Sequence, residues 1–334
     1  MPVTSVDVAR EAGVSQATVS RVIASSDKVL PATRQRVLDA MQRIGYSPNL
    51  VARAMKTQRS NTIGIVAAQL TNPFYPEALQ ELNAALARAD QRMTLWSSEG
   101  AAEGAALEAI RNRMVDGVIF TGGTVETAAL RESATAHLPV VMFNRAVEGF
   151  PGDRVISDNR IGGSLVAQHL LELDHTDIGL IAGPPLISTV KERRVGFERA
   201  LADARVRLRE DACDSVPVLA YDEGFAAMQR ILSRGRPPSA IFCVNDITAI
   251  GAVDAIRSAG LSIPEDVAVA GYDDIAMAAW SSFQLTTVRQ PIAEMATKSV
   301  AMLLERISDR DLPPRTATLP ARLIARRSTS TSSN

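Results

Sequence analysis

Three side chains near the N-terminus, Gln16, Ala17 and Arg21, have the types and the spacing needed to read DNA bases. On a helix, at about 100° per residue, they fall within an arc of roughly 140°, while Val19 and Val22 lie on the opposite side. An arginine can bond bidentately to guanine O6 and N7, and a glutamine near a helix start can pair with adenine or touch a phosphate. Alanine offers a methyl contact, for instance to thymine.

Two helix starts and one glycine frame this helix. Thr4, followed three residues later by Asp7, matches a helix-start pattern, because the hydroxyl can accept from a free backbone N–H and the carboxylate favours the positive helix end. Ser15 can cap the second helix in the same way, and Gly13 supplies the positive φ of a tight turn. The segment therefore predicts a helix-turn-helix that binds DNA. The alternative is an ordinary amphipathic helix pair in which Arg21 is merely solvated.

The charge distribution agrees with a DNA-binding N-terminus. The whole chain has 36 Lys and Arg against 37 Asp and Glu, a net charge of -1. Its first 60 residues nevertheless contain nine basic side chains against four acidic ones. The excess of positive charge lies on the segment where phosphate neutralisation would need it.

The composition excludes several other classes of protein. With 334 residues the chain can form two or three domains, each with its own core. It has no long uninterrupted apolar segment, and Asp7 and Glu11 stand where a secretory signal would be basic and then apolar, so we expect a cytoplasmic protein with no membrane partner. Cys213 and Cys243 have no paired spacing, so we expect no disulfide framework, no metal and no cofactor.

Two further elements follow the helix pair. Apolar residues at helical spacing predict a third helix over residues 31–44, which Gly45 ends. Residues 49–56 can form a short helix of one or two turns. Because so short a helix is marginal alone, we expect it to be ordered only on DNA.

From residue 61 onward, apolar runs alternate with helical stretches. The runs cover residues 62–67, 93–96, 117–120, 140–143, 178–182, 240–244 and 267–271. This rhythm predicts α/β architecture with doubly wound parallel sheets, in two lobes. Neither lobe carries a glycine-rich phosphate-binding motif. In such sheets ligands bind beyond the carboxyl ends of the strands, so two facing lobes would hold one small molecule between them.

The combination resembles the LacI/GalR family of transcriptional regulators over essentially the full chain. The segments that carry the resemblance are Thr-Val-Ser-Arg-Val at 18–22, Tyr-Ser-Pro-Asn at 46–49, Ala-Arg at 52–53, Asn-Pro-Phe at 72–74, Ser-Asp-Asn at 157–159, Gly-Gly at 162–163, Ala-Gly-Pro at 182–184, Arg193 before Gly-Phe at 196–197, Asn-Asp at 245–246, Gly-Tyr-Asp-Asp at 271–274 and Thr-Thr-Val-Arg-Gln at 286–290. The resemblance implies a homodimer that reads a near-palindromic operator, hinge helices in the central minor groove and periplasmic-binding-protein-like lobes.

The resemblance also implies a division of the chain. We expect a helix-turn-helix DNA-binding domain at 1–48, a hinge helix and linker at 49–60, and an effector-binding domain at 61–334. Within the last, we expect the N-lobe at about 61–156 and 288–316, the C-lobe at about 157–287 and 317–327, and a disordered polar tail at 328–334. The tail has no leucine heptads, so we expect a dimer without a C-terminal tetramerisation helix.

The residues that we expect to touch DNA include the hinge. Met55 stands where the family usually has a leucine that wedges between base pairs, and methionine is apolar and flexible enough to keep the kink. The full set is Thr4, Ser5, Ser15, Gln16, Ala17, Thr18, Ser20, Arg21, Asn49, Ala52, Arg53, Met55 and Lys56.

The sequence also departs from the family in two turns. Leu30 replaces a serine cap, partly offset by Pro31 at the first helical position. Asp174 replaces the glycine of a Leu-Gly-His turn, so we expect a different backbone geometry there.

For the effector, the resemblance points to eight residues. They are Phe74, Asn144, Thr189, Arg193, Tyr221, Asn245, Asp273 and Gln290. Asp273 indicates a sugar, because a carboxylate accepts hydrogen bonds from vicinal hydroxyls and is costly to bury without donors. Arg193 and Arg145 leave an anionic effector open. Structural interpretations compete: Asn245 can cap a helix, Asp273 can lie in a solvated turn and Phe74 can belong to the core.

Two other functions compete with transcriptional regulation as interpretations of the sequence. An enzyme needs a nucleophile or metal constellation, and the only histidines, His137, His169 and His175, do not form one by spacing. A pure solute-binding protein would have the same lobes. It would lack the basic head, however, and we would expect it to begin with a signal peptide, a pattern that this sequence does not show. The sequence therefore favours a DNA-binding regulator, a repressor, whose operator affinity is controlled by a sugar or sugar derivative.

Overall fold

The computed structural model describes residues 3–23, 28–47, 59–67, 69–97, 102–122, 127–147, 149–150 and 152–330. The chain divides into two compact units, residues 1–60 and 61–334. Each unit has its own core and is described by itself.

The first unit contains three helices, α1 (Ser5–Ala12), α2 (Gln16–Ile23) and α3 (Pro31–Arg43). The start of α1 is a capping box: the Thr4 hydroxyl accepts from the Asp7 N–H, and the Asp7 carboxylate accepts from the Thr4 N–H at 3.0 Å. Gly13 ends α1 with φ 63°. The predicted helix starts and the turn are therefore present.

The other two helix starts differ in how they are capped. The Ser15 hydroxyl accepts from the Thr18 N–H at 3.1 Å at the start of α2. Leu30 gives α3 no side-chain cap, and Pro31 follows it at the first helical position. The missing N–H of a proline is one that helix formation would leave unpaired, so Pro31 offsets part of this loss.

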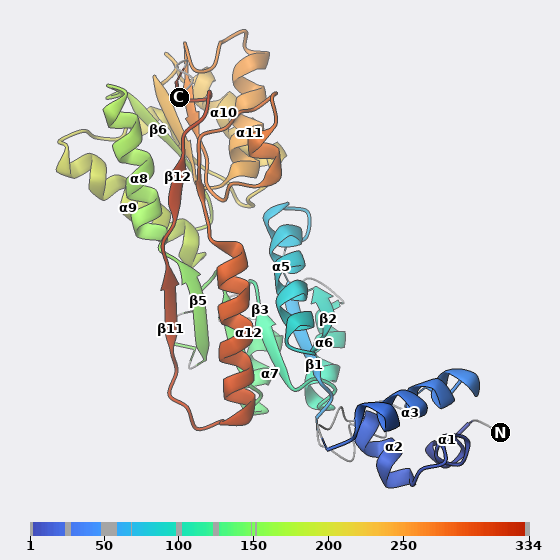
Figure 1. Cartoon of the computed structure of the whole chain (residues 1–334). Helices are drawn as coiled ribbons and strands as arrows, with labels where there is room; N and C mark the ends of the chain where they lie inside the picture. Colours follow the sequence, from blue (N-terminus) through green and yellow to red (C-terminus); the bar gives the residue numbers. More distant parts are fainter. Residues whose placement is uncertain are drawn as a thin grey trace. The chain divides into compact units, whose positions relative to one another are not determined.

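The second unit begins with a six-stranded parallel sheet in the order β11-β5-β4-β3-β1-β2. The strands are β1 (Thr62–Ala67), β2 (Arg92–Ser97), β3 (Gly117–Phe120), β4 (Val140–Phe143), β5 (Asp153–Ser157) and β11 (Thr316–Leu319). Helices α5 (Phe74–Arg88) and α12 (Ile292–Ser308) pack together on one face, and α6 (Ala102–Arg111) and α7 (Ala128–Thr135) pack together on the other (Figure 1). We call this layer the N-lobe.

A four-stranded parallel sheet, in the order β7-β6-β8-β9, forms the second layer, the C-lobe. Its strands are β6 (Ile178–Ala182), β7 (Cys213–Ser215), β8 (Ala240–Cys243) and β9 (Ala268–Ala270). Helices α8 (Asn159–Glu172) and α9 (Ser188–Asp203) pair on one side, and α10 (Tyr221–Ser233) and α11 (Asp246–Ser258) pair on the other (Figure 1). Two short 3-10 helices, η1 (Glu210–Ala212) and η2 (Ala276–Ala279), complete it. The doubly wound parallel architecture predicted from the sequence is confirmed.

The chain passes between the lobes three times. It leaves the N-lobe after β5, returns along β10 (Thr287–Arg289) into α12, and leaves again from β11 into β12 (Arg322–Ile324), which pairs antiparallel with β10 (Figure 1). β11 pairs with β5 through Leu319, so residues 317–319, which we expected in the C-lobe, form an edge of the N-lobe sheet.

The start of the C-terminal tail is ordered, contrary to the expectation of disorder from residue 328. The Ser328 hydroxyl accepts from the Thr286 N–H at 2.7 Å and donates to the Val269 carbonyl at 2.6 Å. The Thr329 hydroxyl lies 2.8 Å from His169 Nε2. Polar composition suggested a solvated tail, but these hydroxyls satisfy backbone groups beside β9 that would otherwise be buried unpaired. Residues 331–334 lie outside the described residues.

The turn at Asp174 also differs from expectation. Asp174 has φ 61°, in the left-handed region that a glycine would adopt. Its N–H donates to the Leu171 carbonyl at 3.0 Å, as in an ordinary helix C-terminus. Aspartate is one of the few side chains that tolerate this conformation, so the turn keeps glycine-like geometry without a glycine.

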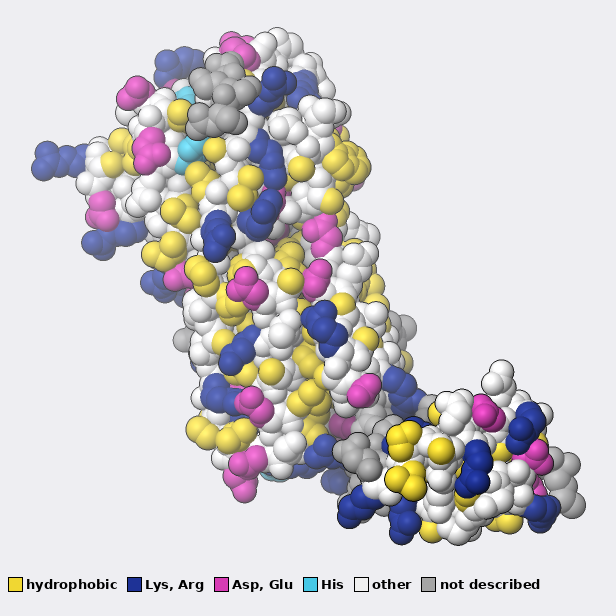
Figure 2. Space-filling view, viewed as in Figure 1, with side chains coloured by type: hydrophobic (Ala, Val, Ile, Leu, Met, Phe, Trp, Pro, Cys, Tyr) yellow, Lys and Arg dark blue, Asp and Glu magenta, His cyan; other side chains and the backbone are white. Residues whose placement is uncertain are grey.

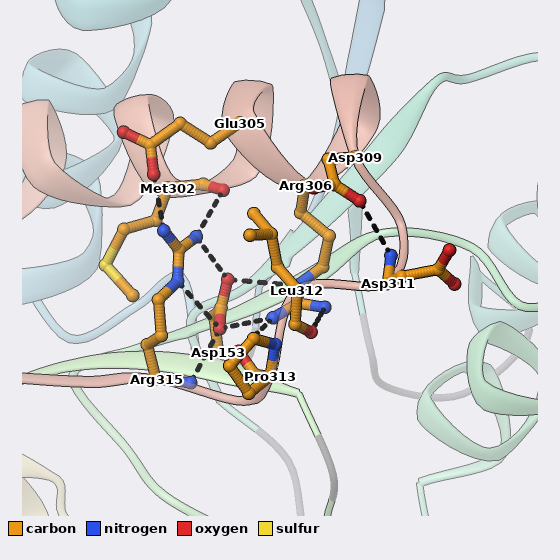
Figure 3. Close-up of polar contacts among 9 residues, drawn as sticks. All are labelled: Asp153, Met302, Glu305, Arg306, Asp309, Asp311, Leu312, Pro313 and Arg315. Atoms are coloured by element: carbon orange, nitrogen blue, oxygen red, sulfur yellow. Dashed lines mark hydrogen bonds and ion pairs between the residues drawn. The ribbon is translucent and has the colours of Figure 1, made fainter.

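A buried ion cluster fastens the loop after α12 to the N-lobe sheet (Figure 3). The carboxylate of Asp153, fully buried at the start of β5, lies 2.7 Å from Arg306 Nη2 and 2.9 Å from Arg315 Nη2. Arg315 also pairs with Glu305 on α12. Burial alone would raise the pKa of Asp153, but the hydrogen bonds from the two arginines outweigh it and lower that pKa.

Candidate functional site

The exposed face of α2 carries the predicted base-reading side chains. Gln16, Ala17, Ser20 and Arg21 are exposed, whereas Val19 is fully buried between the helices. Figure 2 shows several basic side chains on the surface of this unit, at the lower right. One helix face is therefore anchored in the core while its polar face is free to enter a groove.

The remaining predicted contacts of this unit surround that face. Gln16 Nε2 donates to the Ser5 hydroxyl at 3.0 Å, which links the starts of α1 and α2. The Thr4, Ser15 and Thr18 hydroxyls take part in the helix starts described above. The predicted hinge contacts Asn49, Ala52, Arg53, Met55 and Lys56 lie outside the described residues.

The second unit holds a buried polar cluster where strands of both lobes end. Arg193 Nη2 lies 3.0 Å from Asp273 Oδ1, and both side chains are almost fully buried. Arg193 comes from the second turn of α9, and Asp273 follows β9. This position, at the carboxyl ends of parallel strands, is the usual ligand-binding edge of open α/β sheets.

Three other groups hold the Arg193 guanidinium in place. Its Nε donates to Asn159 Oδ1 at 2.9 Å, and its Nη1 donates to the Val244 carbonyl at 2.8 Å. Its central carbon lies 3.6 Å from the centroid of the Tyr272 ring, in cation–π contact. The arginine is therefore fixed by partners from α8, the residue after β8 and the loop after β9.

Two glycines of α8 permit this arrangement. A Cβ on Gly163 would lie 2.0 Å from the Arg193 carbonyl oxygen, and one on Gly162 would lie 2.1 Å from the Tyr272 hydroxyl. Any larger residue would push α9 or the Tyr272 ring away. The Gly-Gly pair therefore lets α8 and α9 approach closely enough to place Arg193 over Tyr272.

Gln290 joins this cluster to the N-lobe. Its Nε2 donates to Asp273 Oδ1 at 2.8 Å, while its Oε1 accepts from the Ser157 hydroxyl at 2.7 Å. Ser157 ends β5 of the N-lobe sheet. A continuous chain of hydrogen bonds therefore runs from Ser157 through Gln290 and Asp273 to Arg193, from one lobe to the other.

The backbone at Asp273 is unusual. Asp273 has φ 121°, a region in which a side chain is strained, and its N–H donates to the Val288 carbonyl at 2.9 Å. Burial raises the pKa of its carboxyl group, although Arg193 and Gln290 act in the opposite direction. Asp273 is thus buried and paired, and the alternative of a solvated turn is wrong.

The other predicted effector residues lie in different surroundings. Phe74 is buried in the main core, edge-on to Tyr75 with 5.4 Å between ring centroids, so the core interpretation describes its packing. Asn245 caps α11 by accepting from the Thr248 N–H at 3.4 Å. Tyr221 is 37% exposed and donates to Asp254 on α11, so the structure does not bring it to the Arg193–Asp273 pair.

Several polar atoms near the strand ends are buried without a hydrogen-bond partner in the described part of the chain. They are Asn144 Oδ1, Arg145 Nε and Asn245 Nδ2. Asn144 follows β4 with φ 68°, and Thr189 is buried in the first turn of α9. Buried polar atoms without partners are costly, so they mark places where a ligand or water completes the bonding.

The predicted effector residues do not include three members of the cluster. They are Ser157, Asn159 and Tyr272, all of which lie in motifs visible in the sequence. A small polar residue at the end of a buried strand was the available signal for Ser157. Tyr272 gave no such signal, because a tyrosine after an apolar run reads as core.

The described residues hold no group of three or more His, Cys, Asp and Glu side chains that could bind a metal ion. Cys243 is fully buried, and burial raises the pKa of its thiol. His169 bonds to Thr329, and His175 bonds to Ser239 at 3.0 Å. In the described ranges, none of the helices has the length and apolar character needed to cross a membrane.

Each of the two units matches a known protein family. Residues 5–49 match the model of bacterial regulatory proteins of the lacI family, and residues 167–329 match that of a periplasmic binding protein-like domain. The HTH-type transcriptional repressor PurR of Vibrio cholerae is 33% identical over 316 residues, 91% of each chain.

Solved structures agree with these matches. A lac repressor dimer bound to operator and the anti-inducer ONPF is similar with a TM-score of 0.84 and 27% identity, over 98% of this chain and 99% of that one. The transcriptional regulator CelR in complex with cellobiose has a TM-score of 0.75 and 31% identity over the same shares. The chain belongs to the LacI family of bacterial regulatory proteins and is a DNA-binding transcriptional repressor with a ligand-binding domain.

Proposed function

We propose that a sugar or sugar derivative binds at the Arg193–Asp273 cluster and controls the affinity of a homodimer for a near-palindromic operator. The observation that carries this proposal is the buried chain of hydrogen bonds from Ser157 through Gln290 to Asp273. It connects the ligand-binding edges of the two lobes, so a ligand that bonds to Asp273 acts on both.

The chemistry of the cluster suits a polyhydroxyl ligand. Both contacts of the Asp273 carboxylate use Oδ1, so Oδ2 is the oxygen that a ligand hydroxyl can reach. The Arg193 guanidinium lies beside this carboxylate, and the Asn245 amide has a donor that no described residue accepts. The CelR structure, which holds cellobiose, supports a sugar in a domain of this fold.

Two more hydrogen bonds cross between the lobes. The Ala276 N–H of the C-lobe donates to Glu77 Oε1 of the N-lobe at 2.8 Å. The Ala146 N–H of the N-lobe donates to the Ser188 hydroxyl of the C-lobe at 3.0 Å. A ligand that changes the closure of the lobes must alter these contacts. The protein therefore has two states, with and without the contacts, and the ligand can bind one of them more tightly.

At the DNA end, we infer that Gln16, Ala17 and Arg21 read bases in the major groove. The hinge at residues 49–56 then enters the minor groove, with Met55 as its wedge. The other basic residues contact phosphates, which fix the position of the protein along the DNA and make its affinity depend on salt concentration. Effector binding changes the separation of the paired hinges and hence their ability to fold on DNA.

A thermal-shift screen tests the ligand class. The panel contains neutral sugars, sugar acids, polyols and nucleobases, because a ligand that binds only the folded state raises the melting temperature. We expect a shift from a polyhydroxyl compound, and we expect the Asp273→Asn variant to lose it. Its matched control, Asp203→Asn on the exposed end of α9, keeps the shift. A shift from nucleobases alone, or one unaffected by Asp273→Asn, would contradict the proposal.

A further inference from the structure

Arg145 is a buried arginine that forms no ion pair with any carboxylate in the described part of the chain. Its side chain is 7% exposed, and among the described residues no Asp or Glu oxygen lies within ion-pair distance of it. Its Nη2 donates weakly to Gln69 Oε1 at 3.4 Å. The guanidinium also hydrogen-bonds the Tyr75 hydroxyl, and its central carbon lies 5.8 Å from the centroid of the Tyr75 ring. Its Nε has no hydrogen-bond partner in the described structure. A buried guanidinium in this condition is costly unless an anion joins it.

The position of Arg145 places it at the ligand-binding edge. It follows β4 and Asn144, whose Oδ1 is buried and without a partner. Its neighbour Ala146 donates to the Ser188 hydroxyl in the first turn of α9. Arg145 therefore approaches the C-lobe at the start of a long helix.

That helix start also favours negative charge. Ile187, the residue before α9, provides no side-chain cap, and the first turn contains no acidic residue. The first N–H groups of an uncapped helix and its dipole attract anions. Arg145 from one lobe and the α9 start from the other thus surround the same corner of the site.

The charges of the cluster leave one positive charge over. The buried Tyr75 phenol lies within electrostatic range of Arg145, Arg193 and Asp273, so the three belong to one neighbourhood. Asp273 is paired with Arg193. Arg145 is the remaining charge.

Other acids nearby do not cancel it. Burial raises the pKa of Asp246 to about 8, and its two carboxyl oxygens accept from the Thr287 hydroxyl and the Ile275 N–H. Glu77 accepts from the Ala276 N–H at 2.8 Å. Each is already bonded within the protein and points to a partner other than Arg145.

We propose that the effector is a sugar acid whose single carboxylate binds Arg145 and the start of α9, while its hydroxyls bind Asp273 and Arg193. This inference rests on the proposed function and names its ligand class. One carboxylate matches the one uncompensated charge. A sugar phosphate would bring nearly two negative charges and leave one of them buried without a partner.

Titration calorimetry with matched ligands tests the inference. Each aldose is paired with its acids, for example glucose with gluconate and glucuronate, and galactose with galacturonate, and glucose 6-phosphate is included. We expect one of the acids to bind at least about tenfold more tightly than its neutral sugar. Arg145→Gln should weaken the affinity for the acid by at least about tenfold and change the affinity for the neutral sugar by less than about threefold. Arg145→Lys should restore part of the lost affinity for the acid. Arg199→Gln, on the exposed side of α9, should change the affinity for neither ligand.

The outcomes separate the two proposals. If a neutral sugar binds more tightly than its acids, or Arg145→Gln weakens both equally, the carboxylate site is wrong and a sugar effector stands. If only the phosphate binds, the single-charge argument is wrong. If no member of the panel binds, both the sugar acid and the sugar effector are wrong. The melting temperature of each variant without ligand, compared with that of the parent protein, shows whether the ligand-binding domain is folded.

Discussion

Arg193 and Asp273 form an ion pair, with 3.0 Å between Nη2 and Oδ1, in which the two side chains are only 3% and 6% exposed. Both charges are removed from water, yet each has further hydrogen bonds, from Arg193 to Asn159 and to Asp273 from Gln290. Such a pair is stable only while both members are present, because either charge alone would be buried without compensation. The proposed effector site is therefore also a structural element of the C-lobe.

Removing one member should destabilise the protein strongly. Asp273→Asn leaves Arg193 without a counter-charge, so we expect the free energy of unfolding in urea to fall by about 3–5 kcal/mol. Asp203→Asn breaks the exposed Arg199–Asp203 pair on α9 and should cost less than about 1 kcal/mol. Equal, small losses in the two variants would show that the buried pair does not hold the C-lobe together.

The Asp153 cluster predicts acid sensitivity. Arginine hydrogen bonds lower the pKa of Asp153 in the folded state, so its stabilisation is fully present above the unfolded pKa of about 3.9 and is lost as the pH falls through the folded pKa. Asp153→Asn should therefore be much less stable than the parent protein at pH 7, and the difference should shrink below about pH 4. Urea unfolding across that range measures it. A difference that stays constant with pH would contradict this assignment.

The ordered start of the tail can be tested through Ser328. Ser328→Ala leaves the Thr286 N–H and the Val269 carbonyl without the hydroxyl that now joins them, and should cost about 1–3 kcal/mol. The control Ser233→Ala removes an exposed hydroxyl that donates to the Arg230 carbonyl, where water can replace it. A Ser328→Ala variant as stable as this control would favour the disordered tail.

Base reading by α2 predicts a change in specificity. Using an operator selected from random DNA, we expect Arg21→Ala to weaken binding by about 1–3 kcal/mol and to relax the sequence preference at one position of each half-site. Arg36→Ala removes the same charge from an exposed position on α3 and should weaken all sequences alike. If both variants lost affinity without a change in preference, Arg21 would contact phosphates only.

Local patterns predicted the head and the strands well. The Thr4–Asp7 capping box, the left-handed Gly13 and the burial of Val19 follow from contacts between near neighbours, so sequence spacing was enough. The apolar runs likewise became the buried parallel strands. In both cases the deciding interactions are local or repeat with a fixed period.

The site itself was less predictable, because its contacts join distant parts of the chain. Ser157 and Gln290 are 133 residues apart, and Arg193 meets Asp273 only once α8, α9 and β9 are packed. The resemblance assigned a role in effector binding to Arg193, Asp273 and Gln290. It assigned none to their partners Ser157, Asn159 and Tyr272, although these lie in the same family motifs. Tyr221 shows the converse case, because the sequence did not reveal that its side chain bonds to Asp254.

The central claim is that effector and operator binding are coupled, and calorimetry tests it most directly. The affinity for the sugar or sugar acid with the largest thermal shift is measured with and without saturating operator. We expect the two dissociation constants to differ by about fivefold or more, and the effector to change operator affinity by the same factor. Equal dissociation constants with and without operator would contradict the account.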